Sequence, residues 1–205
     1  MKIKVCGMRD EENLRELARL PVDAVGFIFY EKSPRFAGAL DPEALAALPA
    51  HVLRVGVFVN AALGEMLHCA KRYQFNVLQL HGEESPAVCE RLRKEGFLIW
   101  KALPVLSAED VRRSADYAAT CDRFLFDAKS PQYGGVGKHF PWELLVHYDG
   151  PTPFFLSGGI APEDLSLLRQ FSHPRFEGID LNSRFEIAPG LKDISKIQEF
   201  LQQLL

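Results

Sequence analysis

Short apolar runs rich in Val, Ile and Phe recur along the chain, and a polar or glycine-bearing stretch follows each of them. Continuous apolar runs of this length are typical of strands that are buried on both faces. Their ends recur about every 25 residues, which is the length of one strand, one helix and two loops. The runs predict eight strands, at residues 3–6, 24–29, 52–59, 77–80, 97–102, 123–127, 153–156 and 176–181.

Helix-start signals lie just beyond several of these strand ends. Proline stands at the predicted first helical position at Pro42, Pro86 and Pro162, where its missing N–H costs nothing. Asn60 and Ser107 are predicted N-caps. Helices therefore follow promptly after the strands.

The segment 191–205 predicts a final covering helix, because its apolar residues recur with helical spacing and Gln and Lys lie opposite them. The apolar face consists of Ile194, Ile197, Leu201 and Leu204.

Eight strand-then-helix units with continuous apolar strands indicate an α/β protein with a parallel sheet covered by helices. They most simply close into a (β/α)8 TIM barrel. A doubly wound open sheet usually has fewer units, and its G-x-G-x-x-G fingerprint is absent after the first strand, where the chain reads CGMRDE. No linker interrupts the series, so residues 1–205 are expected to form one compact barrel domain.

Composition narrows the function classes. The chain has 205 residues, 47% apolar and 25% charged, with a net charge of −3. No run approaches the roughly 18 apolar residues of a membrane span, and no basic cluster supports binding to nucleic acid or to a membrane surface. The partner is therefore expected to be a small molecule, and the composition leaves a monomer and a homodimer equally open.

The cysteines and histidines predict no metal site, because the four cysteines lie far apart without C-x-x-C spacing and the six histidines lack metal-ligand spacing. Unpaired cysteines, with a start MKIKVCGMRD that lacks the apolar segment of a signal peptide, predict a reducing cytoplasm.

In barrels of this kind the site lies at the carboxyl ends of the strands. Polar residues at those positions are the candidates, and they were selected by position rather than by residue type. They are Cys6, Arg35, Gln79, His81, Asp127, Ser157, Gly158, Gly159, Asp180, Asn182 and Ser183.

The stretch 124–142 is the most informative, because three apolar residues lead directly into Asp127 and then into a loop with Lys129 and three glycines. This is the layout of a catalytic acid on a rigid support. An Asp at a strand end is also commonly a turn former or a helix cap. The glycines, Gly134, Gly135 and Gly137, suggest a loop that closes over a substrate.

The other candidates also have two interpretations. Cys6 could be a small buried filler, although Gly7 follows it at once. Arg35, on a loop stiffened by proline, suits a carboxylate or is simply solvated. Gln79 and His81 either line the site or satisfy backbone groups at the strand end.

Two small-residue loops favour phosphate binding over plain tight turns. Glycines at Ser157-Gly158-Gly159 let backbone N–H groups approach an anion, and a helix that begins beyond Pro162 would add a favourable dipole. Asn182-Ser183 closes the eighth strand, and phosphate sites of barrels often use the loops after strands seven and eight.

With these residues assembled, the chain resembles the phosphoribosylanthranilate isomerase family of tryptophan biosynthesis. The matching pieces run in family order across nearly the whole chain, and together they are highly specific. They are KVCGM (4–8), GFIFYEKSPR (26–35), QLHG (79–82), FLFDAKSPQYGGVGKHFPW (124–142), LSGGI (156–160), DLNSRFE (180–186) and PGLKD (189–193).

The resemblance implies an Amadori rearrangement of N-(5-phosphoribosyl)anthranilate to its 1-deoxyribulose isomer, without a metal or organic cofactor. It implies that Asp127 is the general acid, which protonates the furanose ring oxygen, and that Cys6 is the general base, which takes the C2′ proton. Arg35 would bind the anthranilate carboxylate and Asp180 would orient the substrate. The phosphate would lie against Gly158, Gly159, Asn182 and Ser183.

This chemistry needs both catalysts in their minor forms, since near pH 7 a free carboxyl is ionised and a free thiol, with a pKa of roughly 8.5, is protonated. We expect burial or the dianionic substrate to favour the acid form of Asp127, and a nearby cation or a helix N-terminus to lower the pKa of Cys6. Lys129 is a candidate for either part.

One departure from the family pattern is Arg184, which stands where a small residue usually follows Asn182-Ser183. It either adds a phosphate contact or points to solvent.

Two other functions fit a phosphate-binding barrel: a related enzyme, such as ProFAR isomerase or indoleglycerol-phosphate synthase, and a non-catalytic binder of sugar phosphates or anthranilate. A thiol at the first strand end argues against the former enzyme, which uses two aspartates, and against the latter, which would call for a lysine acid there. The intact set of Cys6, Asp127 and Arg35 argues against a non-catalytic binder.

Overall fold

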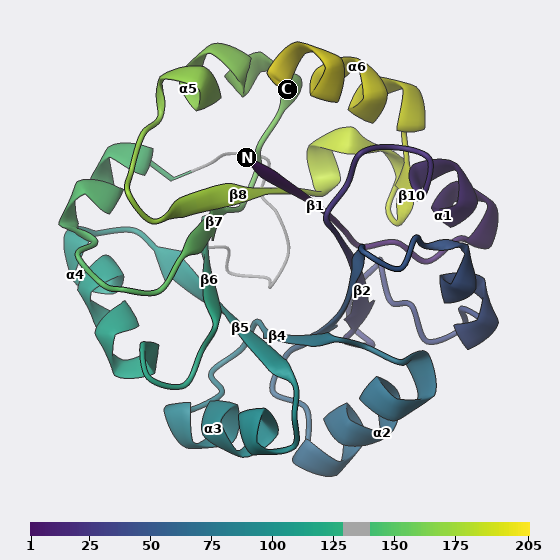
Figure 1. The fold of residues 1–205 in the computed structure, drawn as a ribbon, viewed down its shortest axis with the longest axis horizontal. Helices are drawn as coiled ribbons and strands as arrows, with labels where there is room; N and C mark the ends of the chain where they lie inside the picture. The colour runs from purple at the N-terminus through teal and green to yellow at the C-terminus, as the bar shows by residue number, and fades with distance from the viewer. Residues whose placement is uncertain (129–139) are drawn as a thin grey trace.

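The computed structural model describes residues 1–128 and 140–205. Within them, eight parallel strands pair in sequence order, and the last pairs with the first to close a barrel, which Figure 1 shows end-on. The (β/α)8 barrel predicted from the apolar runs is therefore confirmed. The strands are β1 (Lys2–Cys6), β2 (Ala24–Phe29), β3 (Leu53–Phe58), β4 (Val77–Leu80), β5 (Leu98–Val105), β6 (Arg123–Ala128), β7 (Phe154–Leu156) and β8 (Phe176–Leu181).

Helices lie outside this ring, and several of the connections are 3-10 turns rather than α-helices. The α-helices are α1 (Glu11–Leu17), α2 (Leu63–Tyr73), α3 (Pro86–Lys94), α4 (Ala108–Arg112), α5 (Leu165–Gln170) and α6 (Ile194–Leu204). The 3-10 helices are η1 (Pro42–Ala47), η2 (Arg113–Tyr117), η3 (Trp142–His147), η4 (Pro162–Asp164) and η5 (Ser183–Phe185). A short hairpin of β9 (Glu186–Ala188) and β10 (Leu191–Lys192) joins β8 to α6.

The strand bounds follow the prediction closely, and β2, β4 and β8 agree with it to the residue. The largest difference is β5, which continues to Val105 instead of ending at residue 102. It is longer because the residues from Leu103 to Val105 pair with the end of β6. Pairing with a neighbouring strand is a tertiary effect that the apolar run alone does not reveal.

The helix starts are confirmed in part. Ser107 caps α4: its hydroxyl accepts from the Asp110 N–H, and the Ser107 N–H donates to the Asp110 carboxylate at 3.0 Å. The three prolines each occupy the first turn, but Pro42 and Pro162 begin 3-10 helices. Asn60 as an N-cap is wrong.

Asn60 lies before α2, whose N-cap is Ala62, and adopts a left-handed conformation with φ 52°. Asparagine tolerates this conformation because its short polar side chain bonds locally. Here the Asn60 Oδ1 accepts from the Glu83 N–H at 2.7 Å, which ties the loop after β3 to the loop after β4.

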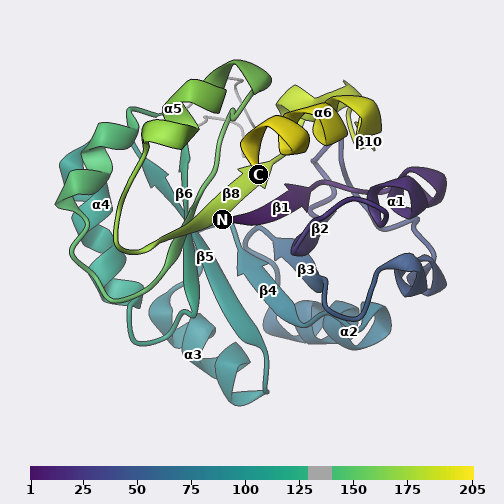
Figure 2. The same ribbon diagram turned by 45° about the horizontal axis from the view of Figure 1, so that its top comes forward.

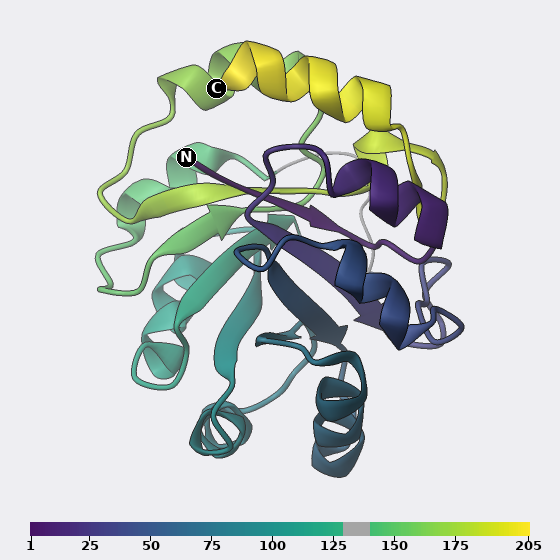
Figure 3. The same cartoon turned by 45° about the vertical axis from the view of Figure 1, so that its right-hand side comes forward.

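The predicted final helix is confirmed as α6, which lies beside α1 and α5 and covers the seam between β8 and β1 (Figures 2 and 3). Ile197 and Leu201 of the predicted face are buried, and Ile194 and Leu204 are partly buried against the same core. The two ends of the chain are thereby packed together.

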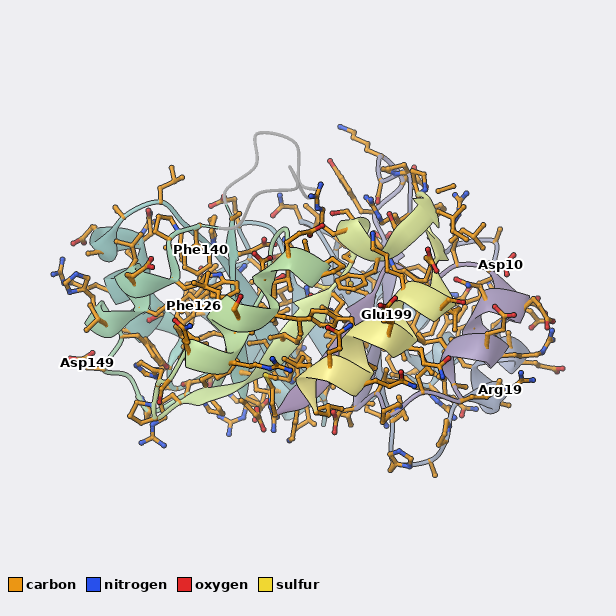
Figure 4. All side chains as sticks on the ribbon, turned by 90° about the horizontal axis from the view of Figure 1, so that it is seen from above. Asp10, Arg19, Phe126, Phe140, Asp149 and Glu199 are labelled. Carbon is orange, nitrogen blue, oxygen red and sulfur yellow. The ribbon has the colours of Figure 1, made fainter. Side chains whose placement is uncertain are left out.

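The side-chain view in Figure 4 looks across the barrel, with Asp10 and Arg19 at opposite ends of α1. Asp10 caps α1 from the loop after β1 by accepting from the Asn13 N–H at 2.8 Å. The helix thus returns the chain to the amino-terminal side, and the carboxyl ends of all eight strands share one face.

Successive strand residues point alternately between the strands and helices and into the barrel, which creates two cores. On β7, Phe154 faces outward into a group of aromatic rings, with centroids 5.2 Å from Phe126 and 5.5 Å from Tyr148. Phe155 faces inward and stacks on Trp100 at 5.1 Å. The outer core holds the helices on, and the inner core supports the site from below.

We predict that Phe154→Ala destabilises the protein by about 3–5 kcal/mol, because Phe154 is fully buried and its removal leaves a cavity among rings that cannot collapse. The free energy of unfolding measured in urea checks this. The control is Val146→Ala, at a residue that is 78% exposed, which should stay within about 0.5 kcal/mol of the parent. Equal effects of the two substitutions would contradict this account of the core.

Candidate active site

A cavity opens among the carboxyl ends of the strands, with about 690 Å³ of empty space that is partly open to solvent. Every residue that the sequence placed in the site lines it. These are Cys6, Arg35, Gln79, His81, Asp127, Ser157, Gly158, Gly159, Asp180, Asn182 and Ser183. Tyr30 and Ser33 also line it and were not predicted, although both lie in the motif at 26–35 that follows the second strand.

Cys6 ends β1 with its side chain inside the barrel and only 4% exposed. Gly26 on the neighbouring strand makes room for it, because a Cβ there would lie 2.7 Å from Sγ. Burial raises the pKa of the Cys6 thiol, and although Lys4 and Lys192 act in the opposite direction, the net shift is upward. The expectation that a neighbouring cation lowers this pKa is wrong in net direction, because desolvation of the thiolate, together with the negative charge of Asp180, outweighs both lysines.

Lys4 and Asp180 form a buried ion pair next to Cys6, with Nζ 2.8 Å from Oδ1 and side chains 0% and 5% exposed. They stand directly opposite each other in the register of β1 and β8. Burial lowers the pKa of Lys4, but Asp180 and the Cys6 sulfur outweigh that effect and raise it. Burial raises the pKa of Asp180.

Lys4 was missed by the sequence reasoning. Its signal was its position, since a charged residue two places before Cys6 on a buried strand must point to the same face as the thiol. It remains protonated and gives the inner barrel a fixed positive charge.

Arg35 reaches the cavity from the loop after β2, and a carboxylate of the chain itself engages it. Its Nε and Nη2 donate to Glu186, with distances of 2.9 Å to Oε1 and 2.7 Å to Oε2. Burial acts to raise the pKa of Glu186, but Arg35 and Lys192 outweigh it and the pKa is lowered. The guanidinium is thus held in a fixed orientation, as a bidentate pair requires.

Lys192 completes this cluster from β10, with Nζ 2.6 Å from Glu186 Oε1 and 2.8 Å from Asn182 Oδ1. Its burial lowers its pKa. Glu186 and Lys192 fall in the matched pieces DLNSRFE and PGLKD, yet nothing in the sequence showed that Glu186 meets Arg35 from the far end of the chain or that Lys192 binds Glu186.

Asp127 lies in β6 and its carboxylate meets His81, with Oδ2 3.1 Å from Nε2. The other ring nitrogen of His81, Nδ1, lies 3.1 Å from the amide nitrogen of Gln79. Gly158 is required beside them, because a Cβ there would lie 2.1 Å from Asp127 Oδ1. The predicted acid is therefore clamped between β4 and the loop after β7. Lys129 and the glycines Gly134, Gly135 and Gly137 lie outside the described residues.

The predicted phosphate loop has the backbone that close approach requires, since Gly158 and Gly159 have φ values of +81° and +78°. The helix beyond Pro162 begins as a 3-10 turn, and the Asp164 carboxylate already accepts from the Ala161 N–H at 2.8 Å. Its dipole is therefore partly compensated. Arg184 is exposed and lies outside the cavity lining.

Within residues 1–128 and 140–205, no three His, Cys, Asp or Glu side chains are grouped as a metal ion would require. None of the helices in those ranges has the length and apolar character needed to span a bilayer.

Residues 3–203 match the model of a family described as N-(5'-phosphoribosyl)anthranilate (PRA) isomerase. The chain belongs to this isomerase family. It is 50% identical over 207 residues to N-(5'-phosphoribosyl)anthranilate isomerase of Parabacteroides distasonis, covering 100% of this chain and 94% of that protein.

Solved structures of phosphoribosylanthranilate isomerases have the same fold. That from Thermotoga maritima superposes with a TM-score of 0.84 at 35% identity, covering 100% of this chain and 98% of that one. A second was solved in complex with reduced 1-(o-carboxyphenylamino)-1-deoxyribulose 5-phosphate and superposes with a TM-score of 0.81 at 32% identity, with the same coverage. The family resemblance seen in the motifs is confirmed over the whole chain.

We predict that Glu186→Gln makes the free energy of unfolding depend less steeply on pH in the acidic range. Because the pKa of Glu186 is lowered in the folded state, its stabilising contribution is present above its ordinary value of 4.5 and is lost as the pH falls through the lower folded value. The variant should be less stable at neutral pH, yet lose less free energy of unfolding on acidification below about 4.5.

Urea denaturation at several pH values measures this effect. Glu199→Gln, at an exposed position on α6, is the control and should follow the parent curve. Parallel curves for the parent and Glu186→Gln would contradict the ion-pair cluster.

Proposed function

We propose that this chain catalyses the Amadori rearrangement of N-(5-phosphoribosyl)anthranilate to 1-(2-carboxyphenylamino)-1-deoxyribulose 5-phosphate in tryptophan biosynthesis. The observation that carries the proposal is one cavity that receives a thiol from β1 and a carboxyl group from β6, in a chain that belongs to the isomerase family. A base and an acid on opposite sides of a sugar are what ring opening followed by proton abstraction requires.

Asp127 is the proposed general acid. It protonates the ring oxygen of the furanose, so that the ring opens and the anthranilate nitrogen becomes part of a Schiff base. Its position supports this role, because the carboxyl group is partly exposed to the cavity while His81 and Gly158 restrict its orientation. The proton lost by Asp127 appears on the C4′ hydroxyl of the opened sugar.

Cys6 is the proposed general base. It removes the C2′ proton of the Schiff base to give an enolamine, which tautomerises to the ketone. The raised pKa of the thiol means that the thiolate is the minor form, so the fixed charge of Lys4 next to it supports the ionised form that acts as base. The base therefore begins in the protonation state opposite to the one that the reaction uses.

The remaining groups are proposed to bind the ends of the substrate. Arg35 uses Nε and Nη2 for Glu186, and its Nη1 donates to no residue that the structure describes, which leaves that edge for the anthranilate carboxylate. The phosphate is assigned to Ser157, Gly158, Gly159, Asn182 and Ser183, and substrate contacts to Gln79, His81 and Asp180.

We also propose that residues 1–205 act as one catalytic domain in the cytoplasm, supported by four free cysteines, which suit a reducing compartment. Both a monomer and a homodimer fit the proposal. The Thermotoga maritima enzyme is described as dimeric and was also solved as generated monomers.

The activity test generates the substrate in place from anthranilate and phosphoribosyl pyrophosphate with a transferase. Loss of its fluorescence is then followed on addition of this protein. A loss no faster than spontaneous decay would overturn the proposed function.

We predict that Cys6→Ala and Asp127→Asn each lower kcat by about 10²- to 10⁴-fold, the usual contribution of a general base or acid. Binding of the reduced product analogue, measured by calorimetry, should remain detectable in both variants, because neither group is needed to hold the phosphate or the carboxylate. Near-parental turnover in either variant would exclude the corresponding role.

We predict that Gly158→Ala lowers kcat/KM by at least about tenfold, because the added Cβ would displace the Asp127 carboxylate. Gly96→Ala is the matched control, since Gly96 has a similar φ of +95° but no atom within 4 Å of the new Cβ. Both variants carry the same backbone strain, so only the loss specific to Gly158 reports on the clamp. Equal activities would contradict it.

A further inference from the structure

A linear set of three side chains, Gln79, His81 and Asp127, crosses from β4 to β6. Gln79 and His81 are two residues apart, so both point into the barrel. The Gln79 amide nitrogen lies 3.1 Å from His81 Nδ1, and His81 Nε2 lies 3.1 Å from Asp127 Oδ2. The imidazole therefore contacts the proposed acid with one nitrogen and a buried amide with the other.

The amide decides which nitrogen of the neutral imidazole carries the hydrogen. An NH2 group can only donate, so Nδ1 must offer its lone pair and the ring hydrogen must be on Nε2. Nε2 lies 3.1 Å from Asp127 Oδ2, so this hydrogen is available to that oxygen. The tautomer of His81 is thus set from behind, by a side chain that is fully buried.

The buried oxygen of the same amide, Gln79 Oε1, has no hydrogen-bond partner among the residues that the structure describes. An orphaned buried oxygen in a barrel strand calls for an explanation. Among those residues, the Gln79 side chain is anchored through its amide nitrogen, which lies 3.1 Å from His81 Nδ1.

The two oxygens of Asp127 are in different surroundings. Oδ2 faces the His81 N–H, whereas Oδ1 lies against Gly158 at the cavity wall. A carboxylic acid whose Oδ2 accepts a hydrogen bond carries its own proton on Oδ1. The proton is then on the oxygen that adjoins Gly158 rather than on the one turned toward His81.

We propose that Gln79 and His81 are positioning residues for the general acid: Gln79 fixes the Nε2–H tautomer of His81, and His81 holds Asp127 Oδ2 so that Oδ1 delivers the proton. When Asp127 gives up that proton, the same N–H stabilises the new carboxylate. This inference rests on the proposed function and assigns the two residues a part beyond the predicted contact with substrate.

The first test removes the amide while keeping its volume. Gln79→Met should lower kcat by about tenfold or more with little change in KM, because tautomer control is lost while the proposed contacts with the anthranilate carboxylate and the phosphate remain. The ¹³C and ¹⁵N chemical shifts of the His81 ring should show only the Nε2–H tautomer in the parent and a mixture in Gln79→Met. A parent His81 in the Nδ1–H form would overturn the proposal.

The second test changes the charge behind the imidazole. In Gln79→Glu, the new carboxylate keeps His81 as the imidazolium, which stabilises the Asp127 carboxylate and disfavours its protonated form. Because the active enzyme needs protonated Asp127 with ionised Cys6, the acidic limb of kcat/KM should move to lower pH. The plateau should fall by the same factor, and the alkaline limb, set by Cys6, should stay in place.

The charged groups that face Gln79, His81 and Asp127 affect the pH dependence of kcat/KM equally in the parent and in Gln79→Glu. Asp180 and Lys4 lie on β8 and β1, and Asp180 interacts with both Asp127 and His81. Neither is altered in the Gln79 variants, so a change confined to the acidic limb reports on His81. An unchanged acidic limb and plateau in Gln79→Glu would overturn the proposal.

The third test is rescue. His81→Gln places an amide N–H near the position of Nε2, so its kcat should be higher than that of His81→Leu. A purely space-filling role of His81 predicts no difference in kcat between these two variants. His68→Gln, on the exposed face of α2, is the control. Equal kcat for His81→Gln and His81→Leu, or an effect on KM alone, would contradict the positioning role.

The failure of this inference can be told from that of the proposed function. A parent protein without isomerase activity would remove the function, while the chemical shifts of His81 would still show whether Gln79 sets its tautomer. If the parent is active and all four variants at Gln79 and His81 keep its kcat, KM and pH dependence, the inference alone is overturned.

Discussion

The ion pair of Lys4 and Asp180 is the constraint on which the site depends. Two charges inside a barrel are tolerated only when they are paired, because desolvation of either alone is costly. They stand opposite each other where β8 closes onto β1, so a slip of one residue would turn one charge outward and leave the other alone. The pair thereby fixes the register of closure, and with it the height of Cys6 relative to the eighth strand.

The same arrangement explains how a thiol and a carboxyl group separated by over a hundred residues share one cavity. Inward positions alternate along every strand, so Cys6 lies one layer above Lys4 on β1, and Asp127 lies above Leu125 on β6. Beneath them lie the buried ion pair of Lys4 and Asp180 and the apolar side chains around Trp100 and Phe155. Chemistry is thus confined to the top layer, where the chain can supply polar groups without disrupting the core.

Each reactive side chain in that layer is in contact with, or lies beside, a supporting side chain. Lys4 lies beside Cys6, Glu186 orients Arg35, and His81 contacts Asp127. These contacts limit the rotamers of the first set, which is how a rigid scaffold keeps catalytic geometry within narrow limits. Lys4 lies on the same strand as Cys6, but His81 comes from the loop after β4 and Glu186 from the β9–β10 hairpin, so the site is complete only when both ends of the chain are folded together.

The sequence by itself determined the eight strands, the barrel and the residues at the strand ends, because apolar periodicity and motif order are local properties of the chain. It could not determine that Lys4 pairs with Asp180, that Glu186 binds Arg35 or that His81 meets Asp127, since these contacts join segments far apart in sequence. It also gave the wrong direction for the pKa of Cys6. Only the tertiary structure decided that, because the two causes that raise this pKa, burial and the nearby charge of Asp180, are properties of the closed barrel rather than of any segment.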